Sequence, residues 1–337
     1  MKLGTATIGG ARVPGMAIGP EGRFQPLADL YAAAGLGAAP STIRQLIEGG
    51  PEELARASQA HTEGQANAQS LDPAGDSFTW EPPIPDAGKV IGVAMNNGAL
   101  NAGAHVEPDG PMFFLKPTSS LVGDGHNIEI GPDYGFTFPE LELGVVIGTT
   151  AKHVSTTDAL DHVFGYSIIN DITSQGLKKG DSIAVDLAPG RKDGPGFDSY
   201  FNWRRVRDDD DNEVYFTYHA RSKGADTFGP MGPWITTADE IANPDDLEVR
   251  GFADGELFAK DTTSSYSYSI ATIISHASRY FTLQPGDIFS CGTAARGTNA
   301  FPRGHHDIDM SLSTPEVSIE IDGLGRLSNR VTHVDAP

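Results

Sequence analysis

The stretch FPELELGVVIG, residues 138–148, places two glutamates, Glu140 and Glu142, at the start of an apolar run. Side chains two residues apart on a β-strand point to the same face, so we expect both carboxylates to project together while Leu141 and Leu143 pack on the other face. Two like charges held close together repel each other, and the repulsion grows as the dielectric constant falls. The stretch therefore predicts either a solvated strand end or a pair of carboxylates that share a cation.

A third carboxylate follows a second apolar run. The stretch YSIINDITSQ, residues 166–175, places Asp171 just after another expected strand, where it can meet groups at a neighbouring strand end. Three carboxylates completed by waters form an oxygen-rich site that suits Mg²⁺, Mn²⁺ or Ca²⁺ rather than zinc. We therefore expect Glu140, Glu142 and Asp171, here named the carboxylate trio, to bind a divalent cation.

The composition and the pattern of apolar runs indicate the fold class. The chain of 337 residues contains 40 glycines and 23 prolines, which favours β-rich architecture with short elements over a helical bundle. From Lys89 onward, short apolar runs separated by turn residues predict strands. One helix is expected within residues 267–283, where Ile270, Ile273 and Ile274 recur at helical spacing. We expect a mostly β fold with some helix, of the α+β class.

Two stretches indicate how the chain is organised. The Pro-rich EPPIPDAG at residues 81–88 predicts a boundary between a small N-terminal domain with its linker, residues 1–84, and a larger domain, residues 85–337. Residues 178–222 form a long polar insertion. Within it, Asp208–Asp211 lack the ligand spacing of a calcium-binding EF-hand loop, so we interpret them as a solvated hairpin tip.

Charge and cysteine content exclude several classes of partner. A net charge of -21 repels phosphate backbones and anionic membranes, so we expect neither nucleic acid nor membrane as a partner. The single cysteine, Cys291, cannot form an internal disulfide, which is typical of a reducing compartment. The N-terminus has no signal-peptide pattern, and no apolar run approaches the ~20 residues that span a bilayer. We expect a soluble cytoplasmic protein.

Several motifs, taken in order, resemble those of the fumarylacetoacetate hydrolase family. The motifs ELELGVVIG and GYSIINDIT are similar to the family's metal-binding strands, and further similarity is found in PMFFLKPTSSLVGDG, RSKGADTFGPMGPWITTADEI, LQPGDIFSCGTAARG and VSIEIDGLGRLSNRV. The resemblance covers roughly residues 85–333 and is weaker before them. It points toward members such as acylpyruvate hydrolase and 2-hydroxyhepta-2,4-diene-1,7-dioate isomerase. It implies a metal-binding catalytic domain built on a mixed β-sheet roll and a small N-terminal α/β domain.

The resemblance also implies a function. The expected activity is divalent-metal-dependent hydrolysis of a C–C bond in a small 1,3-diketo acid, acylpyruvate or other 2-keto acid, as part of catabolism. The expected cofactor is Mg²⁺ or Mn²⁺, with Ca²⁺ as a third option, and the expected assembly is a homodimer. The alternatives are a lyase or isomerase, such as a 2-keto-3-deoxy sugar acid dehydratase, an oxaloacetate-type decarboxylase or a tautomerase, and a catalytically weak metal-binding protein.

By position, the resemblance assigns the carboxylate trio as the metal ligands. Lys223, in a stretch similar to the family's GKSFDTF, is expected to stabilise negative charge on the substrate. Thr293 and Gly292, in the CGT motif, are expected to contact the substrate. A 1,3-dicarbonyl or 2-keto acid can chelate the metal through two oxygens, and the metal then stabilises the enolate formed when a bond to carbon breaks.

The sequence departs from the family pattern where water is activated. The family motif GxNYxxHxxE corresponds here to GVAMNNGALNAGAHVE, so Asn97 stands at the tyrosine place and Leu100 at the histidine place. The usual general base is therefore missing. We expect His105 with Glu107 to substitute for it, the alternative being a solvated loop histidine.

Other polar residues are candidates for binding substrate. Gln175, in ITSQGL, replaces an arginine that is usual in the family. The candidates for gripping a substrate carboxylate are Arg221, Arg296 and Arg303. The stretch RGHHDID supplies His305 and His306, either as an ordinary loop or as a second base, and His306 is the candidate for contact with the substrate.

Overall fold

The computed structural model describes residues 1–337 except 20–21, 76, 99–107, 187–212, 299–302 and 336–337. Within these residues, an 11-stranded sheet has β10 (Leu141–Ile147) and β11 (Val163–Asn170) in its interior. From one edge to the other, its strands are β3 (Arg23–Pro26), β2 (Ala11–Ile18), β1 (Lys2–Ile8), β15 (Gly229–Thr237), β11, β10, β18 (Ile288–Thr293), β5 (Val90–Ala94) and β6 (Met112–Lys116), with β4 (Phe78–Trp80) beside β1 and β7 (Leu121–Val122) beside β15.

The direction of the strands makes this a mixed sheet. Most neighbours are antiparallel, whereas β18 runs parallel to β5 and β15 runs parallel to β7. A second sheet contains β17 (Glu256–Thr262), β16 (Glu248–Ala253), β19 (Glu316–Ile321), β20 (Gly325–His333) and β8 (Ile128–Ile130). The expected α+β class, mostly β and built on a mixed sheet, is confirmed.

Both faces of β10 are buried. On one face, Leu141 and Leu143 pack in a core that includes Ile273 of α8 (Ile270–Tyr280) and Ile319 of β19. On the other face, Val146 packs in a core shared with the N-terminal helices α1 (Leu27–Ala33) and α2 (Ile43–Glu48), which precede α3 (Gly50–Gln59). Burial on both faces explains why the strand sequence is a nearly continuous apolar run.

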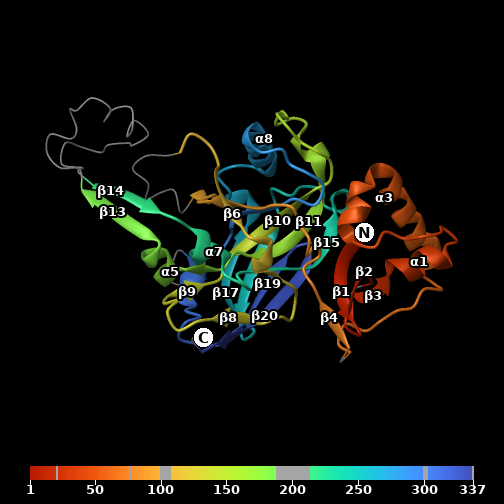
Figure 1. Cartoon of the computed structure of the whole chain (residues 1–337), viewed down its shortest axis with the longest axis horizontal. Helices are drawn as coiled ribbons and strands as arrows, with labels where there is room; N and C mark the ends of the chain where they lie inside the picture. The colour runs from red at the N-terminus through yellow and green to blue at the C-terminus, as the bar shows by residue number, and fades with distance from the viewer. Residues whose placement is uncertain (20–21, 76, 99–107, 187–212, 299–302, 336–337) are drawn as a thin grey trace.

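The N-terminal strands belong to the same sheet as the rest of the chain. β1 pairs with β15 through Lys2 opposite Thr236 and Leu3 opposite Ile235. Figure 1 shows the N-terminal segment, in red and orange, at one side of the molecule with its helices beside the sheet. The expected boundary near residue 84 stays a prediction.

The helix expected within residues 267–283 is α8, and Ser269 caps its N-terminus by accepting a hydrogen bond from the Thr272 N–H. The shorter helices are α5 (Gln175–Gly180) and α7 (Ala220–Gly224). The single-turn elements are η1 (Ala60–Gly64), η2 (Thr118–Ser120), η3 (Ala159–His162), η4 (Ala238–Glu240), η5 (Thr263–Ser265) and η6 (Gly304–Asp307). None of the helices in the described parts of the chain has the length and apolar character needed to cross a membrane.

Two short ribbons complete the fold. β9 (Thr137–Phe138) pairs with β12 (Thr173–Ser174) near the ends of β10 and β11. β13 (Ser182–Asp186) pairs with β14 (Glu213–Thr217), and Figure 1 shows this green ribbon projecting from the molecule opposite the N-terminal segment. These strands lie within the predicted insertion, whose expected tip, Asp208–Asp211, lies outside the described residues.

Candidate metal centre

The carboxylate trio comes together where β10 and β11 lie side by side. The antiparallel register pairs Leu141 with Asn170, so Asp171, directly after β11, lies beside Glu140, directly before β10. The Asp171 N–H donates to the Glu140 carbonyl at 3.0 Å, and the Glu140 N–H donates to the Asn170 side chain at 3.0 Å. Oxygens from the three trio members all lie within 4.8 Å of one another. This spacing allows one cation to contact all three carboxylates.

The neighbouring strand β18 holds both glutamates. Glu142 is 2% exposed, and its carboxylate accepts hydrogen bonds from Ser290 Oγ at 2.6 Å and from the Gly292 N–H at 2.9 Å. The Thr293 hydroxyl donates to Glu140 at 2.6 Å and lies 3.2 Å from Glu142. Gly292 has a φ of +108°, and a Cβ there would lie 2.6 Å from a side-chain atom of the segment after β5, so the position requires glycine.

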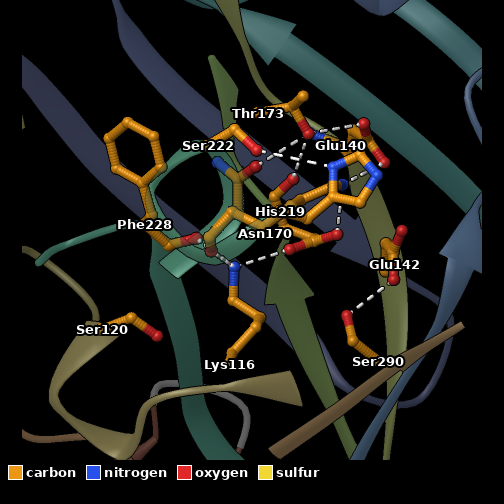
Figure 2. A network of polar contacts seen from close by, with 12 residues as sticks. Lys116, Ser120, Glu140, Glu142, Asn170, Thr173, His219, Ser222, Phe228 and Ser290 are labelled. Atoms are coloured by element: carbon orange, nitrogen blue, oxygen red, sulfur yellow. Dashed lines mark hydrogen bonds and ion pairs between the residues drawn. The ribbon is translucent and has the colours of Figure 1, made fainter. Parts of the chain in front are cut away.

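Two lysines partly neutralise the trio. Lys223 Nζ lies 2.5 Å from Asp171 Oδ2 and 3.1 Å from Glu140 Oε2. Lys116, at the end of β6, is fully buried, and its Nζ lies 2.6 Å from Asp171 Oδ1. Figure 2 shows Lys116 pointing toward the Phe228 carbonyl, to which it donates at 3.1 Å, and it also donates to the Lys223 carbonyl. The two lysines can balance the charge of only two of the three carboxylates.

The side-chain pKa values of the two glutamates are shifted in opposite directions. Burial raises the pKa of Glu142 to about 8, and the charges of Asp171 and Glu140 add to the rise. Burial has the same effect on Glu140, but the Lys223 ammonium, His305 and two threonine hydroxyls overcome it and lower the pKa of Glu140 to about 2. Without a cation, Glu142 is therefore the protonated member at neutral pH. A divalent ion that binds the trio must displace that proton.

A cavity of about 540 Å³ opens beside the trio, and Glu140, Lys223 and Thr293 all line it. Its apolar lining includes Met95, Met112, Phe114 and Phe138. Its polar lining includes Gln175, Lys178, His219, Arg303, His305 and His306. The volume suits a small organic acid, and the mixed lining suits a ligand with both charged and apolar parts.

Comparison with known proteins identifies the family. The family model described as fumarylacetoacetate (FAA) hydrolase C-terminal matches residues 89–332, a range that contains the trio, Lys223 and Thr293. The chain belongs to the fumarylacetoacetate hydrolase family. A protein of Burkholderia ambifaria is 34% identical over 208 residues, and the match covers 61% of this chain and 61% of that relative's length. A 4-hydroxyphenylacetate degradation bifunctional isomerase/decarboxylase from Salmonella dublin is 30% identical over 257 residues, which are 76% of this chain and 49% of that protein.

Solved structures of similar proteins share the fold. Maleylpyruvate hydrolase from Sphingobium sp. SYK-6 has a TM-score of 0.68 and 25% identity, covering 99% of this chain and 100% of its own. A second structure of that enzyme is a complex with manganese(II) and pyruvate. Fumarylacetoacetate hydrolase from Exiguobacterium antarcticum has a TM-score of 0.71 and 24% identity, covering 99% and 100% of the two chains.

The residues that the family resemblance assigns fall in three places. Lys223, Thr293 and His306 line the cavity, whereas Gly292 lies behind it and binds Glu142 through its N–H. Asn97, at the family's tyrosine place, is buried and donates to the Thr293 carbonyl at 2.9 Å, so it braces β18. The predicted bases His105 and Glu107, together with Leu100, lie outside the described residues.

The structure separates the three candidate arginines. Arg221 is exposed, and its guanidinium binds Asp181 at 2.5 Å. Arg296 lines a different hollow of the surface, and its backbone N–H donates to Asp261 at 3.0 Å. Arg303 alone among the three lines the cavity beside the trio.

Three residues of the site were missed by sequence reasoning: Lys116, Lys178 and His219. Lys116 is a charged residue at the end of the apolar run PMFFLK, and this position could have indicated a site residue. His219 stands four residues before Lys223, about one helical turn. For Lys178 the signal was its position seven residues after Asp171, directly after ITSQGL.

Proposed function

We propose that this chain is a metal-dependent hydrolase that cleaves a C–C bond of an acylpyruvate or other 1,3-diketo acid. The observation that carries the proposal is the carboxylate trio, joined by Lys223, beside a cavity of about 540 Å³. In the reaction, water adds its oxygen to the acyl carbonyl, and the C–C bond breaks with its electron pair moving to the pyruvate carbon. That carbon then takes a proton, which leaves a carboxylic acid and pyruvate.

The donor set fits a hard divalent cation. Three carboxylates with oxygens within 4.8 Å provide charge and oxygen ligands and no nitrogen or sulfur ligand, which favours Mg²⁺ or Mn²⁺, with Ca²⁺ as the third option. The manganese and pyruvate complex of maleylpyruvate hydrolase supports the same choice. When bound, the cation would supply Lewis-acid polarisation of the keto acid oxygens.

The residues of the chain supply the other parts of the reaction. Lys223 places a fixed positive charge beside the trio, where it can stabilise an enolate oxygen. The Thr293 hydroxyl, at the edge of the cavity, holds Glu140 and can contact the keto acid. Two groups are proposed to accept the proton of the attacking water. One is His105 with Glu107, and the other is His219, which lines the cavity.

A lyase or isomerase is the second candidate. Leu100 stands where the family places its water-activating histidine, and a reaction without water needs no such base. The similarity to the Salmonella dublin isomerase/decarboxylase is consistent with this alternative.

The cytoplasmic location and the homodimer expected from the sequence also stay proposals.

Product analysis tests the proposed reaction. Purified protein with Mn²⁺ or Mg²⁺ is incubated with a panel of acylpyruvates and 2-keto-3-deoxy acids in ¹⁸O-labelled water, while the enol absorbance is followed. We expect acylpyruvates to be consumed with one labelled oxygen entering the released carboxylic acid. Turnover that yields an unlabelled isomer, a dehydrated acid or CO₂ would instead identify the lyase or isomerase. If no substrate is consumed, the remaining alternative is that the chain is a catalytically weak metal-binding protein.

A further inference from the structure

A second cavity lies between the N-terminal strands and the hairpin formed by β19 and β20, and is here named the hairpin cavity. It measures about 580 Å³ and shares no residue with the described lining of the cavity beside the trio. Its walls include residues of β1, β4, β15, β16, β19 and β20. The proposed function gives this cavity no role, although its volume suits a small organic molecule.

An indole N–H in the wall of the hairpin cavity has no partner. Trp234, on β15, is 9% exposed, and its Nε1 is buried and forms no hydrogen bond with the described residues. The ring is closely enclosed, because a Cβ at Gly22 or at Gly325 would lie 2.9 or 2.7 Å from it. Buried polar atoms are nearly always satisfied, so this donor calls for an acceptor atom from outside the chain.

Lys2 supplies a positive charge that no acid neutralises. Its Nζ lies 4.9 Å from the centroid of the Trp234 ring, and it forms no ion pair or hydrogen bond within the described residues. β1 pairs with β15 through Lys2 opposite Thr236, which lies two residues from Trp234 and so on the same face of β15. The strand pairing therefore holds the ammonium and the indole at one wall of the cavity.

Asp124 supplies a negative charge that no base neutralises. One of its oxygens accepts a hydrogen bond from the Ser328 N–H at 2.6 Å, and the carboxylate forms no ion pair within the described residues. Burial raises the pKa of Asp124 to about 6. A buried carboxylate of this kind is stabilised by a ligand that brings a positive charge and donates to it.

The other charged residues of the hairpin cavity neutralise one another. The Arg250 guanidinium lies 3.1 Å from Glu320 and 3.2 Å from Asp322. Arg326 lies 2.9 Å from Glu320. Within the described lining, Lys2 and Asp124 are therefore the charged residues without an ion-pair partner, one of each sign.

Aromatic and proline side chains form the apolar part of the wall. The Trp80 ring on β4 packs edge-on against Trp234, with a centroid distance of 6.0 Å. Pro73 and Pro233 line the cavity with these rings. This part of the wall suits the carbon skeleton of a ligand.

We propose that the hairpin cavity binds an amino acid zwitterion. The ligand carboxylate pairs with Lys2 and accepts from the Trp234 N–H, the ligand ammonium pairs with Asp124, and the carbon skeleton lies against Trp80. A simple carboxylic acid would leave Asp124 unpaired, and a simple amine would leave Lys2 unpaired, so the cavity favours a ligand with both charges. The proposal does not rest on the proposed function, because no member of the trio takes part.

Titration calorimetry with matched ligands tests the proposal. The probes are L-phenylalanine and 6-aminohexanoate, which differ in the distance between their charges, titrated into manganese-loaded protein. Each is compared with the analogue that lacks the ammonium, 3-phenylpropanoate or hexanoate, and with the one that lacks the carboxylate, phenethylamine or pentylamine. We expect at least one zwitterion to bind roughly 10- to 100-fold tighter than both of its analogues, the range for hydrogen bonds to charged groups.

Two variants assign the two charges. Asp124→Asn keeps an acceptor for the Ser328 N–H, and it should weaken zwitterion binding while leaving binding of the carboxylate analogue unchanged. Lys2→Met should weaken the binding of both. If neither zwitterion binds, if an analogue binds as tightly as its zwitterion, or if both variants keep the affinity of the parent protein, the proposal is wrong.

A spectroscopic signal reports on the indole directly. The chain has three tryptophans, so ¹⁵N-labelled protein gives few indole N–H signals, and Trp234→Phe identifies the one from Trp234. We expect this signal to move when the bound zwitterion is added, and an unmoved signal would contradict the proposed contact. Glu142→Ala should bind the zwitterion as the parent does. Loss of binding in Glu142→Ala would place the ligand at the trio and overturn the proposal, without affecting the proposed function.

Discussion

Lys223 Nζ lies 2.5 Å from Asp171 Oδ2, although 52 residues separate the two in the chain. The same ammonium lies 3.1 Å from Glu140, so it serves two members of the trio at once. The trio would hold the cation through these carboxylates, and a cation bound there would leave Lys223 available to stabilise negative charge on the substrate.

Replacing Lys223 by methionine should remove a charge that the reaction needs. We expect Lys223→Met to lower kcat by roughly 10²–10³, as does the loss of one group that stabilises an oxyanion. Mn²⁺ affinity should not fall, since the variant removes a positive charge from the ligands. Steady-state kinetics and calorimetric Mn²⁺ titration measure the two effects, with Lys179→Met as the control. Parent-like kcat in Lys223→Met would contradict the assigned role.

The raised pKa of Glu142 makes cation binding depend on pH. Its pKa of about 8 means that the metal-free trio holds a proton at neutral pH, and a cation binds only after that proton leaves. Mn²⁺ affinity should therefore rise with pH up to about 8, by about tenfold per unit when one proton is displaced. Calorimetry in two buffers of different ionisation enthalpy should detect the released proton. An affinity that stays constant from pH 6 to pH 8 would show that Glu142 is already ionised.

Lys116 is expected to be a structural residue of the site. It is fully buried and binds Asp171 and two carbonyls, so Lys116→Met removes three polar contacts from a buried site. We expect a loss of roughly 3–5 kcal/mol in the free energy of unfolding, as when one partner of a buried ion pair is removed. Urea unfolding of the metal-free variant measures the loss, with Lys179→Met as the exposed control. An unchanged unfolding midpoint would mean that Lys223 alone satisfies Asp171.

His219 is expected to accept a proton during turnover. It lines the cavity, its ring centroid lies 6.5 Å from that of Phe114, and its Nδ1 lies 3.5 Å from Ser222 Oγ. Burial, assisted by Lys178 and Lys223 and opposed by two aspartates, lowers its pKa, so the ring is neutral at neutral pH.

His219→Gln should therefore lower kcat by about 10²–10⁴ with little change in KM, the usual cost of losing a general base. The exposed His153, replaced by asparagine, serves as the control. The competing assignment is His105, and a parent-like His219→Gln alongside an inactive His105→Gln would place the base there instead.

The sequence predicted the parts of the site that follow from local pattern. The alternation in ELEL placed Glu140 and Glu142, the second apolar run placed Asp171, and helical spacing located α8 within its expected range. The family resemblance is confirmed over residues 89–332. These features depend on neighbours within a few residues, where strand and helix periodicity hold.

The remaining parts depend on contacts between distant segments. Lys116 meets Asp171 across 55 positions, and β1 pairs with β15 through Lys2 and Thr236, which no local pattern indicates. The three candidate arginines were equivalent in sequence. Only the folded chain shows that Arg303 lines the cavity while Arg296 lines another hollow.

Metal-dependent turnover in a ligand variant tests the central claim most directly. Metal-free parent protein, Glu142→Ala and the control Glu256→Ala, whose glutamate is exposed on β17, are titrated with Mn²⁺ while acylpyruvate consumption is followed. We predict that Mn²⁺ restores turnover in the parent and in Glu256→Ala but not in Glu142→Ala. Equal turnover by Glu142→Ala and the parent protein would contradict the proposal that the carboxylate trio holds the catalytic cation.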